Sequence, residues 1–391
     1  MQEVQLIIWD EAPMTQKYAF EALDKTLRDI LGFQKPEKRE QIFGGMTVLL
    51  GGDFRQILPV IPKGKRPDVV QACINRSELW KHCNVFTLTR SMRVNEYYPN
   101  GEIDNQKQDF NQWVLSVGNG IVPAKAKDGE DEPSWIQIPE QFIINSSDSP
   151  IEAIVAETYP NFIERQHDEE YLKERAILTP RNDDVDEINT YMFKKLTGKS
   201  VTYNSADEVC KASTECLDQQ QLYPTEFLNT LNFSGMPPHA LCLKKELPIM
   251  LLRNVNPTKG LCNGTRLIIT ELGEFFIHAK ILTGSHVGDN VLIHRIITTS
   301  NQSKWPFVLK RRQYPVKPCY AMTINKSQRQ SLNYVGLYLP NPVFSHGQLY
   351  VALSRVTNPA GLKILMTEEA DPEFKNCTRN IVYKETFNNL L

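Results

Sequence analysis

The chain has 391 residues, of which 41% are hydrophobic and 23% are charged, and its formal net charge is −2. This composition is that of a globular protein with a sizeable core and room for two or three domains. The nearly neutral balance argues against a basic field over the whole surface, so any contact with nucleic acid has to be local. The eight cysteines show no CxxC pair and no zinc-type spacing, which argues against a zinc site.

No stretch approaches the roughly 20 apolar residues that a membrane span needs, and the first residues lack a basic segment followed by an apolar one. We therefore expect a soluble protein with no membrane partner and with reduced thiols. We expect it in the nucleus, with the cytoplasm as the alternative.

The first feature along the chain is an apolar run, Val4 to Trp9, which ends at Asp10 and Glu11. The run predicts a buried strand whose two acids lie at the carboxyl edge of a parallel sheet. Nucleotide-hydrolysing α/β domains hold magnesium and a water with acids at this edge. Taken alone, however, an Asp-Glu pair after a strand is more typical of the start of a helix.

A helix and a second strand are predicted after the acids. Apolar residues recur at helical spacing over 18–31, with Thr15 placed to cap the helix and Gly32 to end it. The run 46–50 is too short and too apolar for a surface helix, so it predicts a second buried strand, which leads into the loop 51–56. Together these segments predict an α/β unit with loops at two strand ends.

The chain is polar and rich in Gly and Pro between residues 99 and 148, which predicts loops and, beyond them, a domain junction. The run 175–180 predicts the next strand. A helix follows it, and its first turn carries Asn182 and two aspartates, which suit the positive end of a helix. Its apolar positions share one side: Val185, Ile188, Met192 and Leu196.

From Leu247 to about Pro315 the pattern changes to short β-type runs separated by Gly and Asn, at 249–252, 267–270, 275–282 and 291–298. This pattern predicts a small β-barrel inserted into an α/β domain. The α/β pattern then returns, with strands predicted at 319–324, 334–339 and 362–366 and a helix at 349–353.

The phosphate-binding motif GxxxxGK[ST] does not occur in the sequence. In that motif, glycines let backbone N–H groups wrap the phosphates at the start of a helix. The one partial match, Gly198-Lys199-Ser200, has Phe193 at the earlier glycine position and follows a helix instead of a strand. Gly198 is therefore interpreted as the end of that helix.

Eight blocks of the sequence resemble, in order, the petite-integration-frequency family of superfamily 1 DNA helicases, most of all its Helitron-type members. The blocks extend over nearly the whole chain, which makes the resemblance specific. They are LIIWDEAPM, LLGGDFRQILPV, FTLTRSMRV, ILTPRNDDVDEIN, YPTEFLNTL, LPIMLLRNVNPTKGLCNGTRLI, KWPFVLKRRQYPVKPCYAMTINKSQRQSL and HGQLYVALSRV.

The resemblance implies an α/β fold of tandem RecA-like domains of the P-loop-NTPase type, the first of them truncated, with a small inserted SH3-like β-barrel. It places the truncated first motor domain and junction at 1–165, the second motor domain at 166–246 plus 316–391, and the barrel at 247–315. It implies an ATP-dependent 5′-to-3′ DNA helicase acting in DNA repair, recombination or telomere maintenance. Mg²⁺ would be its cofactor, ATP its substrate and single-stranded DNA its partner, while the oligomeric state is left open, with a monomer as the simplest case.

The resemblance also implies a nucleotide site. Asp10 would be the magnesium-associated acid and Glu11 the general base. Gln56 would sense the terminal phosphate, because a neutral amide can donate to phosphate and accept from water. Arg93 and Arg355 would be two arginine fingers, since guanidinium stays charged and binds phosphate oxygens in a bidentate fork.

These assignments have alternatives. Gln56 is by itself compatible with a solvated loop amide, and the two arginines with helix-surface positions. Arg90 competes with Arg93 for the first finger. Gln328, in the motif that couples nucleotide state to strand contacts, is a further candidate to bind the nucleotide.

The resemblance implies a second set of residues that bind the DNA strand. Locally, the segment 262–266 predicts only a hairpin turn. The region 305–317 interleaves basic and aromatic side chains, which suits backbone and base contacts, although the aromatic residues could equally pack the barrel. The strand-binding candidates are Thr179, Asn182, Asn263, Arg266, Arg311, Arg312, Thr323, Lys326 and Ser327.

Arg329 occupies a position where the family usually has glycine. Glycine allows a positive φ or a close backbone approach, so arginine either strains this turn or adds a phosphate contact.

Because the phosphate loop is absent, we expect these 391 residues alone to be deficient in hydrolysis. The family's phosphate-loop strand would lie beside 46–50, so we also expect an open strand edge and a sticky first domain. Two functions follow: a helicase of which this sequence is a shortened form, or a non-catalytic single-stranded-DNA-binding remnant of a transposon helicase.

Overall fold

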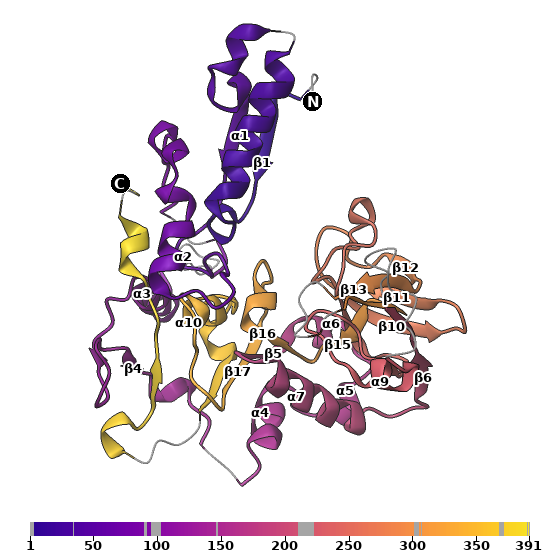
Figure 1. Ribbon diagram of the computed structural model, residues 1–391. Helices are drawn as coiled ribbons and strands as arrows, with labels where there is room; N and C mark the ends of the chain where they lie inside the picture. Colours follow the sequence, from indigo (N-terminus) through magenta and orange to yellow (C-terminus); the bar gives the residue numbers. More distant parts are fainter. Residues whose placement is uncertain are drawn as a thin grey trace. The chain divides into compact units, whose positions relative to one another are not determined.

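The computed structural model describes residues 4–33, 35–89, 92–94, 103–145, 148–209, 223–300, 305, 307–366, 371–388 and 390 (Figure 1). The described residues form a mixed α/β protein, as the sequence predicts. They divide into two compact units, Met1–Ile143 with Leu339–Leu391, and Ile144–Tyr338. The predicted domain limits at residues 165, 246 and 315 stay a prediction. No helix in these ranges is long and apolar enough to cross a membrane.

The first unit begins with a parallel pair of strands covered by a helix. β1 (Leu6–Trp9) pairs in parallel with β2 (Thr47–Leu50), and α1 (Lys17–Gly32), which connects them, lies alongside (Figure 1). Apolar side chains from both layers meet in one core because the strands and the helix each turn one face inward. The core includes Ile7, Trp9, Phe20, Leu27, Val48 and Leu50.

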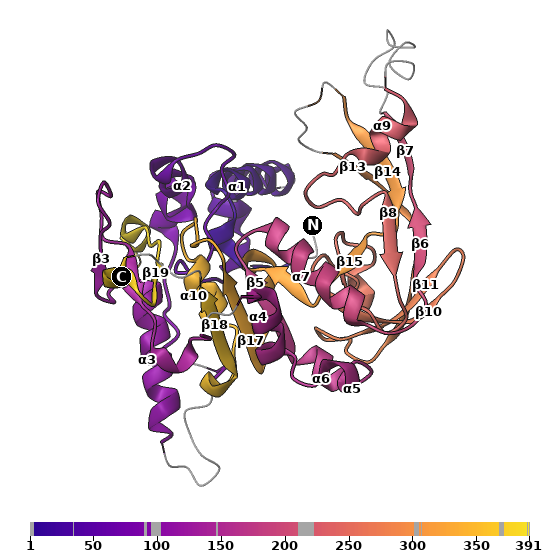
Figure 2. The ribbon, with the colours of Figure 1, turned by 90° about the horizontal axis from the view of Figure 1, so that it is seen from below.

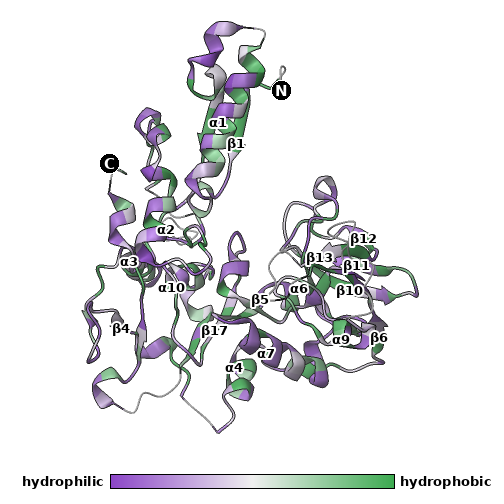
Figure 3. Cartoon of the chain, in the orientation of Figure 1, coloured by the Kyte–Doolittle hydropathy of each residue, from purple (hydrophilic) through white to green (hydrophobic). Residues whose placement is uncertain are grey.

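Only one face of this sheet is buried, whereas the sequence predicts two buried strands. Leu6, Ile8 and Leu49 lie on the other face and are 47%, 66% and 54% exposed, and this apolar stretch is visible along β1 in Figure 3. Successive strand residues alternate between faces, so an apolar run covered on one side leaves half of its members in solvent. Within the described ranges β2 is hydrogen-bonded to β1 and to no other strand, so its far edge is open.

Helix α1 differs from its prediction at its start and on its buried face. Its N-cap is Gln16, which makes no side-chain capping bond. Thr15 instead ends the short 3-10 helix Ala12–Met14 that precedes α1. Tyr18, predicted to face the core, is 62% exposed. Asp24 is buried in its place, and its carboxylate accepts a hydrogen bond of 2.5 Å from the backbone N–H of Phe43.

The rest of the first unit contains three further helices and a small antiparallel sheet among its described residues. Its helices are α2 (Arg66–Ala72), α3 (Asn105–Asn119) and α10 (Gln348–Leu353). An antiparallel sheet has the order β19-β4-β3, with bounds Cys377–Arg379, Trp135–Gln137 and Ala124–Lys125. α10 and β18 (Leu362–Met366) confirm the helix predicted at 349–353 and the strand predicted at 362–366.

The second unit contains a parallel sheet with β5 (Arg175–Thr179) between β16 (Ala321–Thr323) and β17 (Tyr334–Leu339). All five residues of β5 are buried, which explains its unbroken apolar sequence. Helix α7 (Asn182–Lys195) follows β5 directly and buries the predicted apolar side. Three shorter helices belong to the same unit: α4 (Pro150–Thr158), α5 (Phe162–Arg165) and α6 (Glu169–Lys173).

The remaining described strands of the second unit pair in an antiparallel manner, and one short helix, α9, lies among them (Figure 2). The predicted run 291–298 is two strands, β12 and β13, and β7 pairs with β14 although it precedes the predicted barrel. The SH3-like form of the insert stays a prediction. The elements are β6 (Val201–Asn204), β7 (Ala206–Val209), α9 (Thr225–Thr230), β8 (Ala240–Leu243), β9 (Pro248–Leu251), β10 (Arg266–Leu272), β11 (Ile277–Ile281), β12 (Asn290–Ile293), β13 (Ile296–Thr299), β14 (Leu309–Gln313) and β15 (Val316–Pro318).

Candidate functional sites

The two predicted acids lie where the parallel strands of the first unit end. Asp10 and Glu11 follow β1, and Gly51 follows β2. The backbone N–H of Gly51 donates to the carbonyl of Trp9 at 2.9 Å, and that of Ala12 donates to the carbonyl of Gly51 at 2.8 Å. The sheet register therefore continues past the strands and brings the acids beside the loop that leads to Gln56.

Glu11 has a left-handed backbone, with φ 55° and ψ 40°. A residue other than glycine in this region is uncommon, and such conformations concentrate at functional sites. The N–H of Glu11 donates to Oδ1 of Asp10 at 3.0 Å, which ties the two acids together. Glu11 is half-buried, while Asp10 is exposed.

The two predicted arginine fingers meet at one residue, Ser354. The guanidinium of Arg93 donates to the carbonyl oxygen of Ser354 at 2.6 Å, and that of Arg355 donates to its hydroxyl at 2.8 Å. Burial, and next the charge of Arg93, lower the pKa of Arg355 to about 10. The charge of Glu11 acts on both arginines in the opposite direction. Two cations held together at low exposure beside a carboxylate form a site that suits an anion.

The loop that carries Gln56 is held by the segment that carries Arg355. The Tyr350 hydroxyl donates to Oδ2 of Asp53 at 2.8 Å, and burial raises the pKa of that hydroxyl. At Gly347, with φ +72°, a Cβ atom would lie 2.3 Å from the Arg55 carbonyl oxygen, so this approach requires glycine. The predicted residues Asp10, Glu11, Gln56, Arg93 and Arg355 all belong to this one unit.

His346 is a residue of this region that sequence reasoning missed. Its Nδ1 accepts from the Tyr383 N–H at 2.8 Å, so its Nε2 carries the proton and donates to the Phe54 carbonyl at 2.8 Å. Burial lowers the pKa of the imidazole to about 4, which keeps it neutral at pH 7. The available signal was the block HGQLYVALSRV, in which only Arg355 was given a role.

The donor set at the acids fits magnesium. In the part of the chain that the structure describes, no three or more His, Cys, Asp or Glu side chains are grouped to hold a metal ion. Mg²⁺ in nucleotide sites usually keeps several waters and takes one or two carboxylates plus phosphate oxygens. Asp10, exposed and adjacent to Glu11, can supply such a carboxylate. The alternative finger, Arg90, lies outside the described residues.

The strand-binding candidates lie in the second unit, and some share one edge of its parallel sheet. Thr179 and Thr323 are direct partners at the carboxyl ends of β5 and β16. Asn182 begins α7 and is exposed. Lys326 lies in the turn after β16, and its Nζ donates to Oδ1 of Asn263 at 2.7 Å. The structure thus brings Lys326 and Asn263 together, although 63 residues separate them.

Two of these candidates have side-chain hydroxyls that donate hydrogen bonds to other groups of the protein. Thr179 is fully buried, and its Oγ1 donates to Oδ2 of Asp184 at 3.0 Å. Ser327 is also fully buried and donates to the carbonyl of Ile324 at 2.7 Å. A direct contact of either side chain with a DNA strand does not fit this arrangement. Gln328 follows Ser327 in the second unit and is half-buried.

Arg266 is a structural residue in this fold, which corrects its prediction as a strand contact. Its side chain is fully buried and donates to the carbonyls of Leu172, Lys173 and Arg175, at 3.0 to 3.2 Å. The carbonyls of Leu172 and Lys173 lie at the end of α6, where helix C=O groups lack partners, and that of Arg175 lies at the start of β5. The guanidinium therefore caps a helix from inside the protein.

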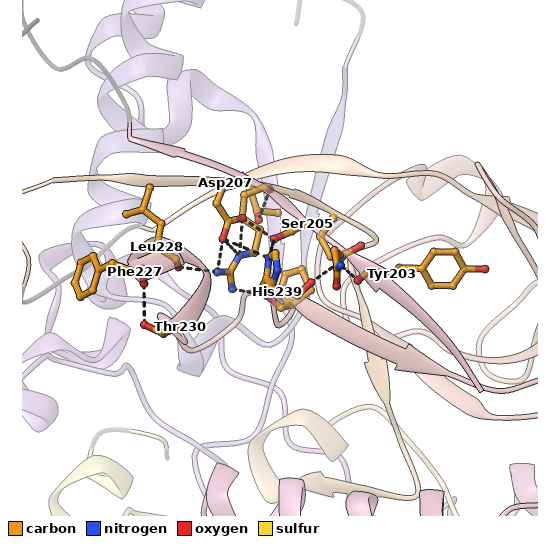
Figure 4. Close-up of polar contacts among 12 residues, drawn as sticks. Tyr203, Ser205, Asp207, Phe227, Leu228, Thr230 and His239 are labelled. Carbon is orange, nitrogen blue, oxygen red and sulfur yellow. Dashed lines mark hydrogen bonds and ion pairs between the residues drawn. The ribbon is translucent and has the colours of Figure 1, made fainter. Parts of the chain in front are cut away.

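Arg311 requires the same correction. Its guanidinium forms a bidentate ion pair with Asp207, with both side chains fully buried (Figure 4). It also donates to the carbonyls of Leu228 and Pro237, and Asp207 accepts from Ser205 at 2.6 Å. A guanidinium enclosed in this way has no surface for a phosphate. The neighbouring Arg312 is exposed and fits the prediction.

The aromatic residues near β14 mostly pack against other side chains inside the protein. Phe307 belongs to a buried cluster with Leu309 and Val209, and Tyr314 is fully buried against Tyr203. Of the three predicted aromatic contacts, Trp305 keeps a substantial exposed surface, 41%.

Comparisons with known proteins agree with the motifs. Residues 1–128 match the family model described as PIF1-like helicase, and residues 226–272 match the one described as DNA helicase Pif1, 2B domain. The ATP-dependent DNA helicase PIF1 of Homo sapiens is 25% identical over 97% of this chain and 48% of its own length. The Xenopus laevis protein is 24% identical over 92% and 46%. The chain thus spans about half the length of these curated relatives.

Solved structures share the fold. A Bacteroides Pif1 bound to ssDNA matches with a TM-score of 0.61 and 18% identity, covering 96% of this chain and 73% of that one. A Pif1 helicase from Candida albicans matches with a TM-score of 0.54 and 20% identity, covering 98% and 76%. These matches confirm the predicted RecA-like α/β fold class. The family models and the curated relatives together support a PIF-family helicase of superfamily 1, and the solved structures show the same fold.

Proposed function

We propose that this chain is the motor part of an ATP-dependent DNA helicase that moves 5′ to 3′ on single-stranded DNA. The observation that carries the proposal is the convergence of Arg93 and Arg355 on Ser354, within electrostatic reach of Glu11. The solved structure of a Bacteroides Pif1 helicase is described as a complex with ADP-AlF3 and ssDNA. This description supports a nucleotide and a single DNA strand as the ligands proposed for this chain. We also propose that the protein acts in the nucleus, in DNA repair, recombination or telomere maintenance. We further propose that it derives from a Helitron-type transposon.

Each candidate site residue of the first unit has its own role in this proposal. Asp10 would bind Mg²⁺, which neutralises phosphate charge when bound, and Glu11 would orient the attacking water and accept its proton. Gln56 would contact the terminal phosphate. Arg93 and Arg355 would stabilise the charge that develops during transfer, an effect typically worth about 10³ to 10⁵ in turnover.

A second candidate function concerns the 391 residues taken by themselves. No GxxxxGK[ST] motif occurs in the 391 residues, so the backbone cradle for the β- and γ-phosphates is not encoded here. These residues alone would then bind single-stranded DNA without hydrolysing ATP. This is the behaviour of a binding protein derived from a helicase.

Two experiments separate these functions. Reading the genomic DNA upstream of the Met1 codon in frame should show a nearby GxxxxGK[ST] for the helicase, whereas stop codons favour the binding protein. Phosphate release should then be measured with oligodeoxythymidylate for the 391 residues and for the extended protein. We expect turnover only in the extended protein, and its loss in Glu11→Gln. Turnover by the 391 residues that Glu11→Gln abolishes would overturn the assigned deficiency.

A further inference from the structure

The hairpin formed by β10 and β11 carries two exposed phenylalanines at its tip. The strands pair in an antiparallel manner, and Leu272 and Ile277 are the last paired residues before the turn (Figure 2). The sequence predicts a strand over 275–282, but β11 begins at Ile277, so Phe275 and Phe276 lie in the turn. They are 69% and 49% exposed. Single apolar residues are common on protein surfaces, whereas adjacent exposed aromatic side chains are typical of an interaction site.

Two tyrosine hydroxyls hold the backbone of this tip. Tyr203 donates to the carbonyl of Gly273 at 2.7 Å, and Tyr314 donates more weakly to that of Glu274 at 3.4 Å. The two tyrosine rings are buried and pack edge to face, with their centroids 5.1 Å apart. The N–H of Gly273 donates to the carbonyl of Phe276 at 3.0 Å, which closes the turn. The phenylalanines are therefore presented on a fixed backbone, which lowers the entropy cost of binding a partner.

The exposed apolar surface continues from the tip onto the neighbouring strand. His278 of β11 is the direct partner of Glu271 on β10 and of Leu292 on β12. Directly opposite residues of antiparallel strands share a face. His278 is exposed and Leu292 is 51% exposed, so this face of the sheet is open to solvent. An apolar side chain thus lies on the same sheet as the two phenylalanines, one strand away from the hairpin.

Two glutamates border this apolar surface. Glu271 and Glu274 are both exposed, and neither forms an ion pair with a residue that the structure describes. Two cations of the same region have other partners: Lys280 of β11 pairs with Glu169 at 2.6 Å, and Arg295 donates to a backbone carbonyl at 2.5 Å. Acidic groups repel the phosphates of DNA and of anionic lipids, and they attract cationic side chains. The surface is therefore complementary to a protein segment that is both apolar and basic.

We propose that this tip surface, formed by Glu271, Glu274, Phe275, Phe276 and Leu292, binds a segment of another protein in which apolar side chains lie beside lysine or arginine. The two phenylalanines supply the central contacts, because a few large apolar or aromatic anchors carry most of the binding energy of an interface. The glutamates pair with the cations of the segment and discriminate against neutral apolar segments. The inference goes beyond the proposed function and does not rest on it, since its ligand is neither a nucleotide nor DNA.

The test is a selection of random linear peptides, displayed on phage, against the immobilised chain, with counter-selection on the double variant Phe275→Ser, Phe276→Ser. We expect the enriched peptides to combine lysine or arginine with leucine, isoleucine or an aromatic residue. Labelled synthetic copies should bind the unaltered chain in an anisotropy assay, and the double variant should lose at least about tenfold in affinity. Glu274→Gln should weaken binding about threefold and reduce its dependence on salt.

Val287→Ser is the matched control. Val287 is 44% exposed and lies in the turn between β11 and β12, at the other end of β11 from the tip. This variant should bind the selected peptides as the unaltered chain does, and an equal loss in Val287→Ser would overturn the assignment to the tip. Thermal melting should be the same for all variants, because the exchanged side chains lie in solvent. If the double variant melts earlier, Phe275→Ser alone, at the more exposed of the two positions, repeats the comparison.

The remaining outcomes contradict the inference. If no peptide is enriched over the double variant, the tip is not a docking surface for a protein segment. Enriched peptides without cations would refute the role of the glutamates. Binding to vesicles of phosphatidylcholine and phosphatidylserine that the double variant loses would assign the tip to a membrane. Binding of oligodeoxythymidylate that the double variant weakens would assign the phenylalanines to stacking on bases.

Discussion

The imidazole of His346 donates a hydrogen bond to the backbone carbonyl of Phe54, two residues before Gln56. This bond joins the segment before α10 to the loop at the end of β2. It works only while the ring is neutral, because Nδ1 must accept from the N–H of Tyr383.

The first prediction concerns the pH dependence of stability. Burial lowers the pKa of folded His346 from 6.5 to about 4, so between these values the unfolded chain binds a proton that the folded chain does not. The free energy of unfolding should therefore fall as pH drops from 6.5 towards 4, by about 1.4 kcal/mol per pH unit from this residue. Urea unfolding of the first unit, followed by tryptophan fluorescence, measures the slope.

His346→Gln is the control for this slope. Glutamine can donate and accept but does not titrate, so the variant should lose the steep pH dependence. His346→Leu should be less stable at every pH, by about 1 to 3 kcal/mol, because the Tyr383 N–H loses its acceptor. An unchanged slope in His346→Gln would refute the assignment of this titration to His346.

Arg329 has φ 65°, which confirms that its turn requires a left-handed residue. Arg329→Gly should stabilise the second unit by about 1 kcal/mol. In the left-handed backbone region a Cβ atom lies too close to the following carbonyl oxygen, and glycine has no Cβ atom. Arg329→Ala keeps the strain and removes the side chain, so it should not gain this stability. Urea midpoints followed by Trp305, the one tryptophan of the second unit, compare the three proteins.

Neighbouring arginines on β14 should respond in opposite ways. Arg311→Ala leaves the buried Asp207 carboxylate without its partner and should destabilise the second unit by about 3 to 5 kcal/mol. Arg312→Ala should change the free energy of unfolding by less than about 0.5 kcal/mol and weaken binding of oligodeoxythymidylate. A stable Arg311→Ala with reduced affinity would restore Arg311 as a strand contact.

The exposed face of β1 and β2 should promote self-association of the purified chain. Ile8→Lys and Leu49→Lys place charges on this apolar face and should reduce light scattering with little loss of stability. Ile7→Lys is the matched control, because Ile7 packs against the core of this unit and should not tolerate a charge. Equal scattering by Ile8→Lys and the unaltered chain would show that this face is not responsible.

Much of the fold follows from local sequence. β17 and β18 begin and end at the predicted residues, because largely apolar runs bounded by polar turns permit few alternatives. Val185, Ile188 and Met192 of α7 and Leu196, which follows it, are all buried, as helical periodicity requires. The burial of β1 was overestimated, because an apolar run does not reveal how many of its faces are covered.

The candidate sites could likewise be predicted from the sequence only in part. The resemblance to the helicase family brought Arg93 and Arg355 into one hypothesis, and both donate hydrogen bonds to Ser354 in the structure. Sequence could not separate Arg311 from Arg312, because their partners Asp207 and Ile297 lie on distant segments. It also gave no role to His346, whose significance depends on a backbone carbonyl that has no sequence signature.

Helix α10 has six residues, and it supports two candidate groups at once: Arg355 after its end and, through Tyr350, the loop of Gln56. A small rotation of this helix would displace both groups in concert. Substitutions that shift α10 should therefore disturb Arg355 and the loop of Gln56 together.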